Sequence, residues 1–389
     1  MGKIRYLEAG AVSLFAVVFS TLLLTVLVVG FMKLMVIDQQ QALNNELSQS
    51  AYDAALAGVE DAKRVVRACQ QGNALACRSL QQPHDCKVVQ RSGVTGRANT
   101  DEVVIQSQSS GDGKEFNQAY TCANVTMDTE DFLTMIPEGR SRIIPLKSKS
   151  EFRTIVVEWF TKDDAGGSDT AGRLHNRYAA FRSLPPRDKW DEGASGGPVP
   201  SLMRAQIITP KQSFQLQDFD ISNGTHAASS TLFLYPQTMA VAGPTNSSLV
   251  AAQPRAGSSL NQQLDHGLEL VNCSKDFANS GYACRAEISV EPVSLAASTN
   301  AYIRLTPLYR LSHVKVTLKG GAAETVRFDG VQPAVDVTGR ASDLFRRVEA
   351  RLQIGDDFPY PENVADIENS LCKDFLVTDS TVTPGLCRP

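Results

Sequence analysis

The histidines are the first residues to weigh for catalysis or metal binding, because an imidazole can act as acid, base or ligand near neutral pH. The chain has five: His84, His175, His226, His266 and His313. No two lie within ten residues of each other, so no helical HExxH or HxxxH pattern exists. The sequence also contains no GxSxG or GxGxxG motif, and the Gly-Lys of SSGDGKEF lacks the other residues of a phosphate-binding loop. We therefore expect no catalytic residues, no metal, no cofactor and no enzymatic activity.

Two polar stretches suggest binding chemistry, and each has a simpler interpretation. The oxygen-bearing residues Asp218, Asp220 and Asn223 could hold calcium, but the glycine and distal glutamate of a calcium loop are missing, which favours a polar turn. A basic stretch could meet nucleic-acid phosphates; it contains Arg140, Arg142, Lys147, Lys149 and Arg153. Because the net charge is −4 and aromatic residues are sparse there, we expect a solvated face and no nucleic-acid partner.

The cysteines are better candidates for covalent chemistry. There are eight: Cys69, Cys77, Cys86, Cys122, Cys273, Cys284, Cys372 and Cys387. They form no CxxC motif, and no histidine accompanies them at zinc-finger spacing. In an exported chain an even number of cysteines indicates disulfides. We expect the local pairs Cys69–Cys77, Cys86–Cys122, Cys273–Cys284 and Cys372–Cys387. The connectivity of the first four stays open, as does the alternative that some are free buried thiols.

Export depends on the apolar segment near the N-terminus. Ala11 to Gly30 are twenty residues without a charge, and Leu34 to Ile37 are apolar again. About twenty apolar residues in a helix cross a bilayer core of roughly 30 Å. A cleavable signal has a shorter apolar core and a small-x-small site, which DQQQALNNELSQS does not supply. Lys3 and Arg5 precede the segment, so the N-terminus is expected in the cytoplasm and the rest outside.

The same helix is predicted to continue well past the membrane. No proline or glycine lies between Phe31 and Ala57, and residues 38–67 are mostly good helix formers. The face that recurs at helical spacing contains Leu43, Leu47, Ala51, Ala54, Gly58 and Ala62. Small residues allow helices to approach closely, so this face could assemble subunits together with Phe15. The alternative is that it packs on the chain's own sheet, and both can hold for opposite faces.

After Gly72 the sequence becomes rich in β-prone runs with a period of two. We expect an α+β fold, in which a long hydrophobic-then-amphipathic helix packs on an antiparallel, β-rich, exported body with disulfides. The expected segments are a cytoplasmic leader (1–10), a transmembrane segment (11–37), the exported half of the helix (38–70), a globular body (71–355) and a C-terminal disulfide loop (356–389). Long loops are expected at about 163–201 and 242–262, where Gly, Pro and Ser gather.

This layout resembles type IV pilin-like proteins, particularly the minor-pilin or PilX-like kind. The likeness lies in GAVSLFAVVFSTLLLTVLVVGF after a short basic leader, in SQSAYDAALAGVEDAKR (48–64), and in VTGRASDLFRRVEARLQI (337–354). The last stretch is similar to a pilin ending in which a Thr-Gly turn precedes the final strand. The resemblance implies cleavage after Gly10 by a prepilin peptidase, leaving Ala11 as the mature N-terminus.

One residue departs from the family pattern. Pilins typically carry a glutamate five residues into the mature chain, where this sequence has Phe15. No carboxylate lies between Ala11 and Asp38, and Glu8 precedes the expected cleavage position. Either this is a subunit type without the glutamate, or Gly10 is not cleaved and the segment stays an anchor.

The resemblance implies a structural subunit of a type IV pilus or pseudopilus, minor or tip-like, with adhesive contacts. Its partners would be the inner membrane, other pilin subunits, the prepilin peptidase, the assembly machinery, and a host or neighbouring cell surface. It would be a single-pass membrane protein with an exported body, reaching the cell surface after assembly. The alternative is a membrane-anchored binding module or hydrolase that does not polymerise.

Overall fold

The computed structural model describes residues 9–81, 85–95, 102–106, 117–171, 187–191, 197–208, 229–238, 247–251, 268–274, 276–277, 281–290 and 301–353. The chain divides into two compact units. Unit 1 consists of Met1–Thr129 and Asp329–Ile354, and unit 2 contains Glu130–Phe328. The stretch 71–355, expected as one body, therefore contributes to both units. The reason is that strands on either side of Glu130–Phe328 pair with each other.

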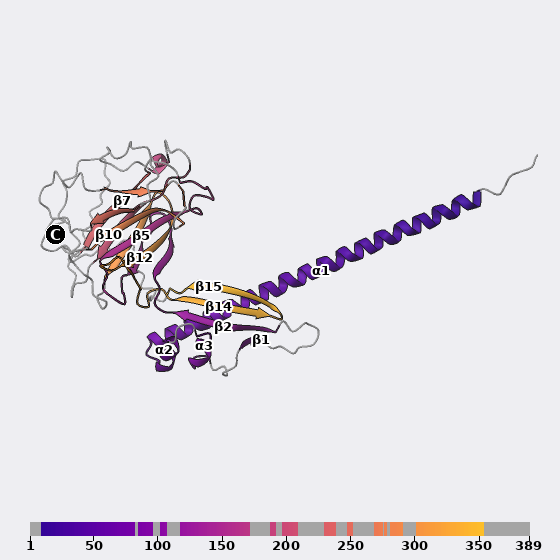
Figure 1. Ribbon diagram of the computed structural model, residues 1–389, viewed down its shortest axis with the longest axis horizontal. Coiled ribbons are helices and arrows are strands. Elements are labelled where there is room, and N and C mark those ends of the chain that lie inside the picture. The colour runs from indigo at the N-terminus through magenta and orange to yellow at the C-terminus, as the bar shows by residue number, and fades with distance from the viewer. Residues whose placement is uncertain are drawn as a thin grey trace, which may run out of the picture. The chain divides into compact units, whose positions relative to one another are not determined.

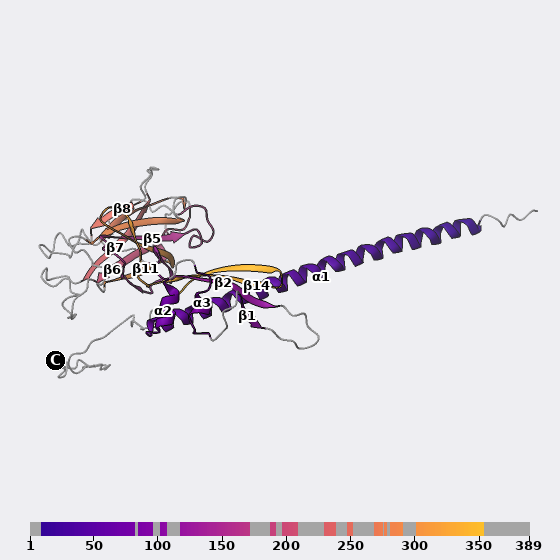
Figure 2. The ribbon, with the colours of Figure 1, turned by 60° about the horizontal axis from the view of Figure 1, so that its bottom comes forward.

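Unit 1 is a long helix on a four-stranded antiparallel sheet (Figures 1 and 2). Its helices are α1 (Ala9–Gln70), α2 (Ala74–Leu80) and α3 (Val88–Arg91). Its strands are β1 (Val103–Gln106), β2 (Gln118–Thr126), β14 (Ala334–Ala341) and β15 (Leu344–Arg351), in the order β1-β2-β14-β15. The α+β fold class with a long N-terminal helix is confirmed.

The helix α1 covers the expected helical stretch almost residue for residue. It runs for 62 residues without a break, because no proline interrupts it. Its C-terminal half packs on β2, β14 and β15, where Val59, Val65 and Val66 join Tyr120 and Val337 in one apolar core. Hydrophobic burial there fixes the helix to the sheet.

The β14–β15 hairpin corrects one detail of the pilin likeness. Thr338 and Gly339, expected as a turn, lie inside β14. The turn falls at Ser342 and Asp343, and Ser342 adopts a positive φ of 51°. Gly339 is needed where α1 crosses, since a Cβ there would lie 2.1 Å from the Ala51 carbonyl oxygen.

Unit 2 is built on an eleven-stranded sheet in the described part of the chain. Its elements are β3 (Asp131–Ile136), β4 (Arg142–Pro145), β5 (Thr154–Thr161), the 3-10 turn η2 (Arg187–Lys189), β6 (Leu202–Ile208), β7 (Ser229–Thr238), β8 (Ser247–Ala251), β9 (Leu268–Cys273), β10 (Tyr282–Ser289), β11 (Tyr302–Leu308), β12 (Ser312–Lys319) and β13 (Thr325–Val326). Several of these strands can be followed in Figure 2.

The pairing in unit 2 is mostly antiparallel, with two exceptions. Strand β8 pairs in parallel with β10, and β7 pairs in parallel with β9. Strand β8 lies within the stretch expected as a long loop at 242–262, so that expectation is wrong for Ser247–Ala251. The remainder of that stretch lies outside the described residues. The pairing is possible because a parallel ladder can be made by residues distant in sequence.

Candidate functional site: the N-terminal helix

The N-terminal half of α1 leaves its apolar side chains uncovered. Every residue from Leu14 to Ile37 is exposed, and Phe15 retains 74% of its accessible surface. In Figures 1 and 2 no strand of unit 1 lies beside this half of the helix. The segment is long and apolar enough to cross a membrane. A core helix of a soluble protein would be buried, so an anchor or an export signal is the interpretation that fits.

The small-residue face of α1 packs on the chain's own sheet, which is the alternative that the sequence left open. Ala51, Ala54, Gly58 and Ala62 are buried against the sheet of the same chain. A Cβ on Gly58 would lie 2.6 Å from Val337 Cγ1, which shows how close the two elements come. These four residues therefore pack within the chain and are not free to meet another subunit.

The remaining residues expected on the assembly face are less covered. Leu43 and Leu47 are half-buried, and Phe15 is exposed. Gly10 and Ala11, at the expected cleavage position, lie in the first turn of α1. The leader residues 1–8 lie outside the described residues.

A buried polar contact locks the same helix to its sheet. The Tyr120 hydroxyl donates to Asp61 Oδ2 at 2.9 Å, and Arg64 Nη1 lies 3.1 Å from Asp61 Oδ1. Asp61 is only 7% exposed, so these partners offset the cost of removing its charge from water. The sequence did not predict this pair; the available signal was that Asp61 recurs at helical spacing with Ala54 and Gly58 on the small-residue face.

Three disulfides lie among the described residues, two within unit 1 and one within unit 2. They join Cys69 to Cys77, Cys86 to Cys122, and Cys273 to Cys284. These are three of the four local pairs expected from the sequence. The first links the end of α1 to α2, and the third links β9 to β10. Cys372 and Cys387, with the C-terminal loop 356–389, lie outside the described residues.

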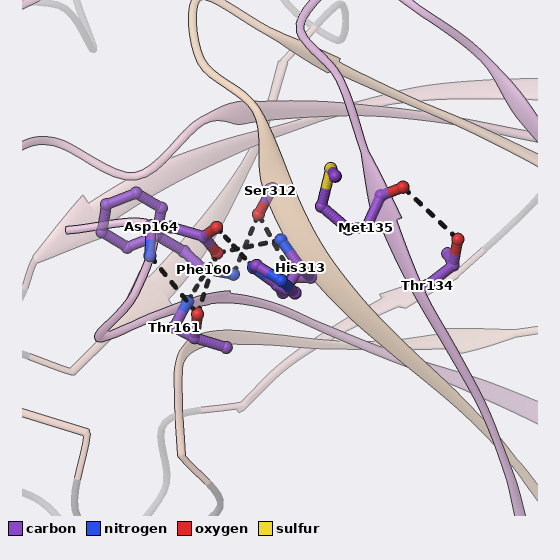
Figure 3. Close-up of polar contacts among 7 residues, drawn as sticks. All are labelled: Thr134, Met135, Phe160, Thr161, Asp164, Ser312 and His313. Atoms are coloured by element: carbon purple, nitrogen blue, oxygen red, sulfur yellow. Dashed lines mark hydrogen bonds and ion pairs between the residues drawn. The ribbon is translucent and has the colours of Figure 1, made fainter. Parts of the chain in front are cut away.

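A cluster in unit 2 bears on the hydrolase alternative, because it combines a serine, a histidine and an aspartate (Figure 3). His313 Nδ1 lies 2.7 Å from Asp164 Oδ1, and the fully buried Asp164 side chain also accepts from the backbone N–H of Thr161 and of His313. Ser312 precedes His313 on β12, so its side chain points to the opposite face of the sheet. Its hydroxyl accepts from the Phe160 N–H at 3.0 Å and donates to the His313 carbonyl at 3.2 Å. The cluster holds the turn after β5 against β12 and does not present this serine to the imidazole.

The other polar stretches do not form a site among the described residues. No group of three or more His, Cys, Asp or Glu side chains in that part of the chain could hold a metal ion. Asp218, Asp220 and Asn223 lie outside it. Of the basic stretch, Arg142 belongs to β4 and Arg153 pairs with Glu151 at 3.4 Å, so the positive charges are divided between different elements.

Comparison with known proteins adds no relative. No protein-family model, curated protein or solved structure matches the chain. The class is therefore defined by architecture alone: a long, apolar N-terminal helix packed on antiparallel strands, as in pilin-like proteins. The apolar helix and the disulfides indicate an exported protein.

Proposed function

We propose that the chain is a structural subunit of a type IV pilus or pseudopilus-like filament. The observation that carries this proposal is the division of α1 into two halves. One half is anchored in the chain's own sheet, while the other extends as an uncovered apolar rod. A plain membrane anchor needs no helix that continues without interruption into the folded body.

Exposure of the N-terminal half of α1 to water would be strongly unfavourable in free energy. Between Leu14 and Ile37, 18 large apolar side chains are exposed. Burying each stabilises by about 1.5–3 kcal/mol, so covering all of them is worth on the order of 30–50 kcal/mol as an upper bound. Lipid supplies that environment first, and helices of neighbouring subunits supply it after extraction from the membrane.

We assign the chain to a minor or tip-like position that makes adhesive contacts. What supports this is unit 2, a large insertion that unit 1 does not need for its own sheet. Phe15 also supports the minor position. It stands where other pilins carry a glutamate, and some minor, PilX-like subunits lack that glutamate as well. The partners would be the inner membrane, other pilins, the prepilin peptidase, the assembly machinery and a neighbouring cell surface.

We further propose that the chain acts without catalysis. This rests on the Ser312 hydroxyl, which is engaged by backbone groups on the face of the strand opposite to His313.

The decisive experiment is to determine the N-terminus by mass spectrometry. Protein would be taken from membranes and from sheared surface filaments, with and without the prepilin peptidase. A mature chain that begins at Ala11 in the sheared fraction, only when the peptidase is present, supports the proposal. An intact Met1 in both fractions, or a cut near residue 50 that frees a soluble body, would sink it and favour the anchored or released module.

A further inference from the structure

A row of charged residues follows the side of α1 that points away from its own sheet. It consists of Glu46, Asp53, Glu60 and Arg67, all exposed and each seven residues from the next. Seven residues make nearly two helical turns, rise about 10.5 Å and drift by only about 20° around the axis. The four side chains therefore lie on one stripe, three acidic and the last basic.

The charges along this part of the helix are segregated. From Asp38 to Asp61 every charged residue is acidic, and beyond Asp61 the helix contains only Lys63, Arg64 and Arg67. The helix dipole favours a basic last turn, which accounts for Arg67, but its effect fades within about one turn of each end. It does not explain a line of carboxylates in the middle of a 62-residue helix.

Most charges of this row are not neutralised by ion pairs among the described residues. Among the described residues, Glu60 pairs with Lys63 at 3.5 Å, and Asp53 accepts a hydrogen bond from Gln49 at 3.1 Å but forms no ion pair. Glu46 and Arg67 form no ion pair with the described residues. The opposite charges of the stripe are thus presented outward.

We infer that this row sets the register between two parallel copies of the chain, an inference that rests on the proposed filament role. If a second copy is displaced along the axis by seven residues or a multiple of seven, its Arg67 comes level with Glu60, Asp53 or Glu46 of the first. These displacements are about 10, 21 or 31 Å. Displacements of 7 or 14 residues also place carboxylates of the row opposite each other, whereas a displacement of 21 residues, about 31 Å, pairs Arg67 with Glu46 and aligns no two carboxylates. Because Arg67 and Glu46 are complementary at that displacement, the partner that the row fits is another copy of the same chain.

Apolar surface beside the row gives the contact area. Tyr52 and Leu56 are 43% and 39% exposed and lie next to Asp53 on the same side of the helix. Exposed ion pairs change an equilibrium by no more than about fivefold each, so apolar burial supplies most of the affinity. The charges select the alignment, since a shift by one residue would rotate the row by about 100°.

Charge reversal in the full-length chain tests this inference. The readout is the amount of chain in sheared filaments relative to the membrane, by immunoblot. Arg67→Glu turns attraction into repulsion, and we expect it to lower that ratio by about three- to tenfold. Of the second reversals, Glu46→Arg should restore the ratio to within about twofold of wild type, whereas Asp53→Arg and Glu60→Arg should restore it less. The variant that restores it identifies the displacement.

Arg78→Glu is the matched control. Arg78 is exposed and lies in α2, outside the row, and its substitution by Glu changes the net charge by the same amount. It should leave the ratio unchanged, and protease resistance in detergent should show that every variant is folded. The inference is overturned if Arg67→Glu has no effect, if none or all of the second reversals restore assembly equally, or if only a change in a different filament subunit restores it. A wild-type chain that is absent from sheared filaments would instead refute the filament role itself.

Discussion

At the scale of single residues, the polar groups that matter most are those buried with a defined partner. Asp61 meets Tyr120 where α1 packs on its sheet. In unit 2, Glu158 is 4% exposed and pairs with Lys315 at 2.6 Å. Such pairs cost little while both members are present, but removing one leaves a buried group unsatisfied.

We expect Tyr120→Phe to destabilise unit 1 by about 1–3 kcal/mol, because the Asp61 carboxylate loses its hydroxyl donor while remaining buried. Chemical unfolding of the full chain in detergent measures this change. Tyr302→Phe is the control, since the Tyr302 hydroxyl has no hydrogen bond with the described residues. An equal effect of the two substitutions would contradict the role of the Tyr120–Asp61 pair.

Glu287 predicts a pH dependence. Burial alone would raise the pKa of Glu287, but hydrogen bonds from Lys319 at 3.0 Å and Arg285 at 2.6 Å outweigh it, so the pKa lies below its ordinary value. A carboxyl whose pKa is lowered on folding contributes stability that is present above its unfolded pKa, about 4.3, and is lost as the pH falls through the folded pKa.

Glu287→Gln should therefore lower the stability of unit 2 at pH 7, and the difference from wild type should shrink as the pH falls below about 4.3. Thermal unfolding of both proteins from pH 7 downward provides the test. A difference that stays the same over this pH range would show that the charge of Glu287 is not responsible.

At the scale of elements, the contact between α1 and β14 depends on the absence of side chains. A Cβ on Gly339 would lie 2.1 Å from the Ala51 carbonyl oxygen and 2.4 Å from the Ala55 nitrogen. Both are backbone atoms, so the helix could accommodate a methyl group only by moving away from the sheet.

Gly339→Ala should lower the free energy of unfolding by about 1–3 kcal/mol, since overpacking at a rigid contact forces the backbone to shift. The unfolding midpoint of unit 1 is the measurement. Gly321→Ala serves as the control, because the nearest atom to its Cβ would be Arg153 Nε at 3.7 Å, an ordinary contact. If both variants unfold alike, the close approach of helix and strand is not limiting.

The helices and strands that have a clear hydrophobic period were predictable from the sequence. Helix α1, the alternating strand β5 and the final hairpin follow from periods of 3.6 and 2. The role of the small-residue face did not follow, because close packing on a sheet and close packing on another helix require the same residues. Strands β3 and β9 were not predicted, since DFLTMI and LELVNC do not sustain an apolar–polar period of two.

At the scale of the whole molecule, unit 2 is an insertion between neighbouring strands of unit 1. Thr126 on β2 lies opposite Ala334 on β14, and Thr129 Oγ1 donates to the Gln332 carbonyl at 3.2 Å. The two points where the chain leaves and re-enters unit 1 are thus adjacent. No local pattern could show this, because the strands that pair are about 200 residues apart.

We predict that a chain in which a short Gly–Ser linker replaces residues 130–328 still folds as unit 1, is processed at Gly10 and enters filaments. Unit 1 keeps its four strands and two of its disulfides in such a chain. Surface adhesion should be lost. Mass spectrometry and filament shearing check the first part, and a cell-binding assay checks the second. If the shortened chain were absent from filaments although folded, assembly would require unit 2.

The insertion also sets an order of events as the chain is made. Strand β14 covers the small-residue face of α1, yet it is synthesised about 200 residues after β2. At about 5–20 residues per second this interval lasts roughly 10–40 s. During that time all the strands of unit 2, from β3 to β13, are synthesised and can form their sheet, while Ala51, Ala54 and Gly58 are not yet covered by β14. The nascent helix is therefore most vulnerable to proteases, and most in need of a chaperone, before its last hairpin arrives.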